Sequence, residues 1–165
     1  MGDQAGHNKD FPVSWGEAHR NARALAWRLA DKGPLEGGKW KGIVAVTRGG
    51  MVPACIVARE LDILVIETFC IVTYGNAGKG QDMGDNNVLK VSDQVDDDGL
   101  GWLVVDDLVD SGGTFRIIRK YLPKAHYAAI YAKPAGVDTI DTYISELSQD
   151  TWVHFPWEVD PPVKG

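Results

Sequence analysis

The sequence predicts an α/β fold in which a mostly parallel, twisted sheet is flanked by helices. Apolar segments of strand length alternate along the chain with segments of helical periodicity. Glycine-rich or acidic turns follow two of these apolar segments. Ligands bind beyond the carboxyl ends of the strands in such sheets, so we expect a binding site at that edge.

Composition and charge limit the class of protein. The chain has 165 residues, 44% of them hydrophobic and 24% charged, as is typical of a soluble globular domain with a full core. Its net charge of -6 argues against a nucleic-acid partner, because such affinity comes largely from Lys and Arg at phosphates. We expect one domain over residues 13–165, preceded by a disordered N-terminal extension over residues 1–12.

The sequence also favours a cytoplasmic location. The first eleven residues lack the apolar core of a signal peptide, and no segment approaches the ~18 apolar residues of a membrane span. Cys55 and Cys70 lie in or beside apolar segments without the spacing of a zinc site. We interpret both as reduced, buried thiols.

The first half of the chain should contain two helices and a strand. Ser14 and Glu17 form a capping box. The apolar residues that follow recur at helical spacing, at positions Trp15, Ala18, Ala22, Leu25, Ala26 and Leu29. After a glycine-rich loop, residues 42–46 predict a strand, and a second helix should run from about Pro53 to Leu61.

The second half continues this alternation. Residues 63–72, 102–105 and 127–132 predict strands, and a helix should begin near Gly113. Residues 74–87 contain four glycines and almost no apolar side chain, which predicts a mobile lid loop inside the domain.

The segment VVDDLVDSGGT, residues 104–114, predicts a ligand site. Neighbouring side chains on a strand point to opposite faces, so Asp106 and Asp107 can serve two different ligand groups. Residues 111–114 stand at a helix start, where unpaired backbone N–H groups favour an anion and glycines let a phosphate approach closely. Carboxylates for hydroxyls or a metal, next to amides for a phosphate, suit a sugar phosphate.

Other interpretations of this segment compete with a sugar-phosphate site. A Walker B strand also ends in acids, but the chain has no GxxxxGK[ST] motif, because Gly78-Lys79 is followed by Gly80. A solvated turn would explain an isolated Asp pair or Gly pair, yet it does not explain the whole segment. A phosphorylated receiver domain has an acidic pocket but no use for Gly112-Gly113 before a helix.

The same segment resembles the phosphoribosyl pyrophosphate motif of the type I phosphoribosyltransferases, which has four apolar residues, two acids, a short spacer and a Thr- or Ser-Gly-Gly-Thr loop. Three more segments resemble the bacterial xanthine-guanine branch of that family, in the same order and spacing: GIVAVTRGGMVP, IYAKPAG and QDTWVHFPW. The likeness extends from about Trp15 to Trp157. It implies the family fold, with a small hood region beside the sheet.

The resemblance implies how phosphoribosyl pyrophosphate is held. Asp106 and Asp107 would hold the ribose hydroxyls and Mg²⁺, with Asp107 on the metal side. The loop of Asp110, Ser111, Gly112, Gly113 and Thr114 would wrap the 5'-phosphate. Asp110 would also lie against N7 of a purine as the catalytic general acid/base.

A pyrophosphate loop is implied at Arg48 and Gly49. In the family a cis peptide bond, which here would join Thr47 to Arg48, turns backbone amides toward the anion. The sequence departs from the family where the lid returns to the sheet, because Val91 stands where an arginine that contacts pyrophosphate is common. Lys90, or Lys79 from the lid, would replace that contact.

A purine pocket is implied at three residues. Lys133 would donate to the 6-oxo group, whereas the amino group of adenine would face this ammonium unfavourably. Trp152 would stack on the base, and Val153 would offer backbone groups to the C2 substituent. His154 stands beside this pocket without an assigned role, and core packing explains the other tryptophans.

Taken together, the resemblance implies a Mg²⁺-dependent purine salvage enzyme. It would convert guanine, xanthine or hypoxanthine and phosphoribosyl pyrophosphate to the nucleoside 5'-monophosphate and pyrophosphate, as a homodimer or homotetramer. Transfer to another nitrogen base is one alternative, which Lys133 and Trp152 argue against. A non-catalytic nucleotide-binding regulator is the other, which the intact Arg48, Asp107 and Asp110 argue against.

Overall fold

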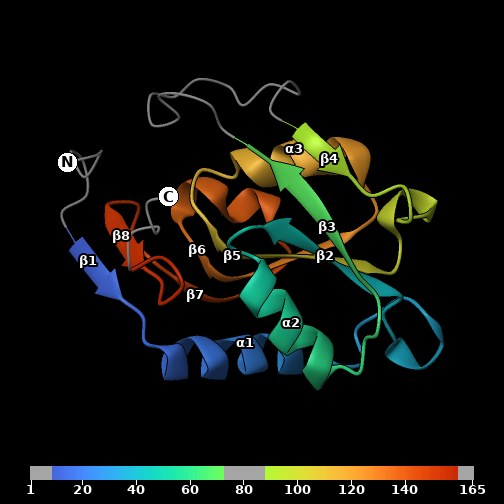
Figure 1. Ribbon diagram of the computed structural model, residues 1–165, viewed down its shortest axis with the longest axis horizontal. Helices are drawn as coiled ribbons and strands as arrows, with labels where there is room; N and C mark the ends of the chain where they lie inside the picture. The colour runs from blue at the N-terminus through green and yellow to red at the C-terminus, as the bar shows by residue number, and fades with distance from the viewer. Residues whose placement is uncertain (1–8, 73–87, 160–165) are drawn as a thin grey trace, which may run out of the picture.

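The computed structural model describes residues 9–72 and 88–159 (Figure 1). Its main sheet contains β2 (Gly42–Thr47), β3 (Ile66–Ile71), β4 (Val88–Val91), β5 (Trp102–Val109), β6 (His126–Ala132) and β7 (Thr142–Glu146). A separate ribbon pairs β1 (Lys9–Pro12) with β8 (Thr151–His154). The α-helices are α1 (Trp15–Leu29), α2 (Met51–Glu60) and α3 (Gly113–Tyr121), and the 3-10 helices are η1 (Glu36–Gly38), η3 (Asp97–Gly99) and η4 (Pro134–Thr139).

The main sheet has the strand order β4-β3-β2-β5-β6-β7. The five strands β3, β2, β5, β6 and β7 are parallel to one another, and the edge strand β4 runs antiparallel to β3. Because β2, β5 and β6 are parallel neighbours, their carboxyl ends lie together at one edge of the sheet. The predicted mostly parallel α/β fold is therefore confirmed.

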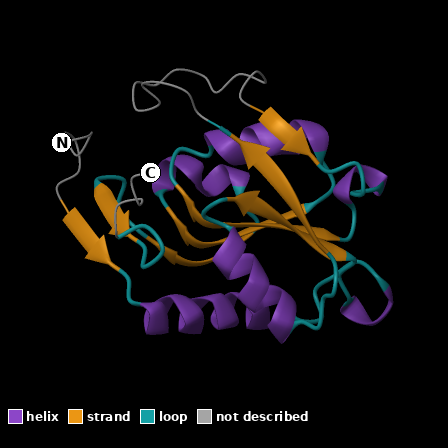
Figure 2. Cartoon of the chain, in the orientation of Figure 1, coloured by secondary structure: helices purple, strands orange, loops and turns teal. Residues whose placement is uncertain are grey.

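Helices cover both faces of this sheet (Figure 2). Ile43 of β2 and Leu103 of β5 share a buried cluster with residues of α1 and α2. Val44 and Val104, their immediate neighbours in sequence, belong to a second cluster that includes side chains of α3. The apolar residues 42–46 and 102–105 do not alternate with polar ones because these strands are buried on both faces.

Most predicted elements form, with shifted boundaries. The helix expected from about Pro53 begins at Met51, and the strand expected over 63–72 spans Ile66–Ile71. The largest difference is in β5, which continues to Val109 instead of ending at residue 105. Asp106 stays paired with Ala129 of β6, so both acids lie within the strand and are positioned by its ladder.

The N-terminal prediction is wrong for residues 9–12. They form β1, which runs parallel to β8, and residues 1–8 lie outside the described part of the chain. Phe11 packs edge-on against Tyr131 of β6, with ring centroids 5.6 Å apart. The β1–β8 ribbon beside the sheet is the small hood region that the family resemblance implies (Figure 1).

Other predictions meet mixed outcomes. The expected lid, including Lys79, falls largely on residues 73–87, which are outside the described ranges. Cys55 and Cys70 are free thiols, but Cys55 is exposed and Cys70 is half-buried, so the predicted burial is wrong for both. Core packing fails to explain Trp15 and Trp27, whose exposed fractions are 58% and 61%. Across the described residues, no helix is long and apolar enough to cross a membrane.

We expect the N-cap of α1 to contribute measurably to stability. Ser14 Oγ accepts a hydrogen bond from the Glu17 N–H at 3.1 Å. Ser14→Ala should lower the free energy of unfolding by about 1 kcal/mol, because that N–H loses its partner, whereas Ser14→Asp should keep the cap. Urea unfolding of both variants tests this, and equal stability of the two would contradict it.

Candidate active site

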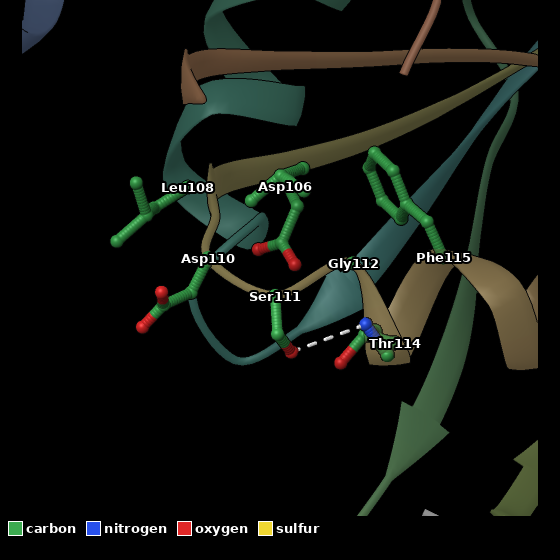
Figure 3. A pocket seen from close by; sticks show the side chains of 9 residues that line it. Asp106, Leu108, Asp110, Ser111, Gly112, Thr114 and Phe115 are labelled. Carbon is green, nitrogen blue, oxygen red and sulfur yellow. Dashed lines mark hydrogen bonds between the residues drawn. The ribbon is translucent and has the colours of Figure 1, made fainter. Parts of the chain in front are cut away.

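The loop between β5 and α3 forms a small cavity at the carboxyl edge of the sheet. Gly112 precedes the first residue of α3 with φ at +88°, a conformation that favours glycine. A Cβ there would also lie 2.7 Å from Thr139 Cγ2. The cavity of about 120 Å³ is bounded by this loop, by Asp106 and by Phe115 (Figure 3). Its position at the N-terminus of α3 favours a small anion such as a phosphate.

The two acids of β5 have different surroundings. The Asp106 carboxylate lines this cavity and accepts the backbone N–H of Asp107 at 2.8 Å. Asp107 is buried, and its Oδ2 accepts the indole N–H of Trp157 at 3.3 Å. A Cβ on Gly49 would lie 2.6 Å from the same oxygen, so this glycine allows the turn after β2 to approach Asp107. The acids therefore serve two loops, as their adjacency in the strand predicts.

Both carboxyl groups are poorly compensated by protein charges. Burial raises the pKa of Asp106 well above its ordinary value, and the neighbouring Asp107 charge adds to that rise. Burial also raises the pKa of Asp107, although hydrogen bonds from Asp106 and Trp157 oppose this. Within the described residues, neither acid forms an ion pair with Lys or Arg. A bound cation would favour the ionised form of both groups.

The donor set suits a cation that takes only part of its shell from protein. No group of three His, Cys, Asp or Glu side chains among the described residues could hold a metal ion. Mg²⁺ commonly uses one or two carboxylates together with water and substrate phosphates. Asp106 and Asp107 fit that requirement.

The turn after β2 lies beside Asp107. The peptide bond between Thr47 and Arg48 is cis, which confirms the expectation from the family resemblance. A Cβ on Gly50 would lie 2.2 Å from the Val105 carbonyl oxygen, so glycine is needed where this turn packs on β5. The Arg48 side chain is exposed at the same edge.

Asp110 and Lys133 come together from two strands. Lys133 directly follows β6, and its N–H donates to the Val109 carbonyl at 2.9 Å. Its side chain is only 2% exposed, and Nζ lies 3.4 Å from Asp110 Oδ2. A surface lysine, the default interpretation of a Lys-Pro pair, is therefore excluded. A Cβ on Gly136 would lie 2.5 Å from Val109 Cγ1, so this glycine lets η4 pack against the end of β5.

Trp152 and Val153 lie on the hood strand β8. The Trp152 side chain is 38% exposed, whereas Val153 is buried. A hollow of about 400 Å³ is lined by both residues together with Pro12, His154 and Glu158. His154 Nε2 lies 2.9 Å from Asp10 Oδ1 of β1. The remaining predicted residue, Lys90, belongs to β4 opposite Cys70, but its side chain lies outside the described part of the structure.

Sequence reasoning missed two residues that contact the site. The Gln149 amide donates to Asp110 Oδ1 at 2.6 Å, and Trp157 donates to Asp107. Burial raises the pKa of Glu158, the negative charge of Asp107 adds to that rise, and the positive charge of Arg48 opposes it. All three lie within or next to the segment QDTWVHFPW. That segment was the available signal, but the contacts depend on the folded chain.

Comparisons with known proteins agree with this geometry. The family model described as the phosphoribosyl transferase domain matches residues 14–164. A xanthine-guanine phosphoribosyltransferase of Nitratidesulfovibrio vulgaris strain DP4 is 51% identical over 152 residues, which cover 92% of this chain and 86% of the relative. The protein of that name from Desulfotalea psychrophila is 49% identical over 160 residues, covering 97% and 92%.

Solved structures agree at the level of the fold. The purine phosphoribosyltransferase of Pyrococcus horikoshii superposes with a TM-score of 0.71 at 21% identity, covering 95% of this chain and 99% of that one. A xanthine-guanine-hypoxanthine phosphoribosyltransferase of Helicobacter pylori gives 0.63 at 18% identity, covering 91% and 94%. The family model and the relatives at about half identity establish more than the fold: the chain belongs to the phosphoribosyltransferase family.

Proposed function

We propose that the protein is a Mg²⁺-dependent phosphoribosyltransferase for 6-oxopurines. It transfers the phosphoribosyl group to guanine, xanthine or hypoxanthine and releases pyrophosphate and the nucleoside 5'-monophosphate, as in purine salvage. One observation carries this proposal: the Nζ of the buried Lys133 lies 3.4 Å from Oδ2 of Asp110. This contact brings a lysine that can recognise a base next to the loop that would bind the phosphate. The names of the relatives at about 50% identity support it.

The sugar donor would lie across the carboxyl edge of β5. Backbone N–H groups of residues 111–114 at the start of α3 bind the 5'-phosphate in this proposal. Asp106 and Asp107 hold the ribose hydroxyls, with Asp107 also on the Mg²⁺ side, where it faces the turn that carries Arg48 and Gly49. When bound, Mg²⁺ would offset negative charge on the pyrophosphate. Arg48 and Lys90 contact the pyrophosphate and stabilise its departure.

The purine would occupy the space reached by Lys133, Asp110 and the hood. The Lys133 ammonium can only donate, so it favours a 6-oxo group over the amino group of adenine. Asp110 lies at N7 and moves a proton there as general acid/base while N9 attacks the anomeric carbon. Trp152 stacks on the purine ring, and such stacking contributes ~1-3 kcal/mol in other base-binding sites. Val153 offers backbone groups to the C2 substituent.

We also infer a homodimer or homotetramer in the cytoplasm. Apolar side chains that would gain from burial are exposed on the described surface, among them Trp15, Leu64 and Val65. Light scattering coupled to gel filtration measures the assembly, and a monomeric mass at micromolar concentration would contradict it.

Direct assays test the function. A spectroscopic assay should detect turnover of guanine, xanthine or hypoxanthine in the presence of phosphoribosyl pyrophosphate and Mg²⁺. Chelation of the metal should abolish this turnover. Adenine should be a poor substrate because of Lys133. Turnover of a different nitrogen base, or nucleotide binding without turnover of any purine, would favour the alternatives instead.

Lys133→Met should lower kcat/KM for 6-oxopurines by about 10- to 100-fold, because a charge-assisted hydrogen bond contributes roughly 1.5-3 kcal/mol. Lys124→Met is a suitable control: Lys124 pairs with Asp98 at 3.9 Å on the surface, and its loss should leave turnover unchanged. Equal kinetics of the wild-type protein and the Lys133 variant would contradict the proposed recognition of the 6-oxo group.

Trp157→Phe should raise KM for phosphoribosyl pyrophosphate by roughly 5- to 100-fold, because Asp107 Oδ2 loses its indole partner inside a buried site. Trp27→Phe is the matched control, since Trp27 also donates to a carboxylate at 3.3 Å, that of Glu60, far from this edge. The two variants are compared by steady-state kinetics. If they show the same KM, Trp157 does not position Asp107.

A further inference from the structure

Gln149 lies in the turn between β7 and the hood strand β8 and connects two parts of the candidate site. Its side-chain Nε2 donates to Asp110 Oδ1 at 2.6 Å, and its Oε1 accepts the backbone N–H of Ala135 at 2.9 Å. Ala135 belongs to η4, the 3-10 helix that directly follows Lys133. One amide side chain therefore joins the hood turn, the phosphate loop and the turn after β6.

The two oxygens of Asp110 have different partners. Gln149 donates to Oδ1, and Lys133 Nζ lies 3.4 Å from Oδ2. The Asp110 side chain is 55% exposed, so packing alone does not select its rotamer. The orientation of the carboxylate consequently depends on these two donors.

The chemistry of the amide explains why glutamine suits this position. Gln149 must donate to a carboxylate and accept from a backbone N–H at the same time. A carboxylate side chain only accepts when ionised, and an ammonium only donates. Glutamine does both with one planar group, so its contact with Ala135 fixes the direction of its N–H toward Asp110.

We propose that Gln149 is a positioning residue that orients Asp110 toward N7 of the purine; this inference rests on the proposed function. With base bound, Lys133 shares its N–H groups between Asp110 and the 6-oxo group. Gln149 meanwhile keeps Oδ1 engaged, which leaves Oδ2 directed at the base. The expected defect of a Gln149 variant is therefore in proton transfer and base recognition.

A structural role alone would predict a different outcome, and two substitutions separate the roles. Gln149→Glu keeps an oxygen for the Ala135 N–H, removes the donor to Asp110 and adds a negative charge beside it. Gln149→Met removes both hydrogen bonds without adding charge. Gln94→Glu is the matched control, because Gln94 donates to Asp93 Oδ1 at 3.0 Å in an exposed turn away from the site.

The readouts are kcat and KM for guanine between pH 4.5 and 9, with thermal unfolding of each variant. Gln149→Glu should lower kcat/KM by about 10- to 100-fold near neutral pH. The acid side of its pH profile should also change shape, whereas that of Gln149→Met should not, because only Gln149→Glu adds a titratable carboxylate beside Asp110. The other charged groups around the Asp110 loop are Asp106 on β5, Lys133 after β6 and Arg116 on α3, which is paired with Asp138. All three are unchanged in the variant.

Each outcome is decisive. The proposal is supported if both Gln149 variants lose rate, only Gln149→Glu changes the acid side of the profile, and Gln94→Glu matches the wild-type protein. It is overturned if Gln149→Glu keeps the wild-type profile, or if both Gln149 variants lose rate only in proportion to a lowered unfolding temperature. Absence of turnover in the wild-type protein would instead overturn the proposed function, and this inference with it.

Discussion

The parallel pairing of β5 with β2 on one side and β6 on the other is the constraint on which the candidate site depends. Register pairs Ala45 with Val105 and Val109 with Ala132, so the turns that leave these three strands emerge at one edge. Each turn brings a different chemistry: an arginine and glycines after β2, a glycine-rich loop after β5, and a lysine after β6. Steric fit holds them together, because a Cβ at Gly49, Gly50 or Gly136 would overlap a neighbouring segment.

Burial gives the side chains at this edge their electrostatic character. Asp107 and Lys133 are buried and Asp106 is half-buried, and interactions between charges are stronger in such surroundings than in water. Lys133 has Asp110 as its partner, whereas the two acids of β5 have hydrogen bonds but no protein cation among the described residues. That imbalance is what a substrate carrying hydroxyls, phosphates and Mg²⁺ would correct.

The hood and the segments next to it position side chains of the candidate site. It is attached to the main sheet through a buried cluster that includes Val13, Tyr131 and Phe155. The turn before β8 carries Gln149 to Asp110, and the segment after it carries Trp157 to Asp107. Phe155 and Trp157 stack with ring centroids 4.9 Å apart, which orients the indole N–H. The proposed base pocket and the proposed donor site are thus held by the same C-terminal segment.

The sequence by itself determined the fold class, the glycine-rich loop before α3 and the residues of the carboxyl edge. These are local signals: an apolar segment followed by Asp106-Asp107, glycines at a helix start, and motif segments around Arg48 and Lys133. Only the tertiary structure decided that residues 9–12 form a strand, that β5 extends through its acids, and that Gln149 and Trp157 contact Asp110 and Asp107. The physical reason is that these features depend on partners far along the chain. β1 is stabilised by pairing with β8, and Asp106 is held by its pairing with Ala129 of β6. Asp110 and Asp107 accept hydrogen bonds from Gln149 and Trp157, whose local sequence does not indicate these contacts.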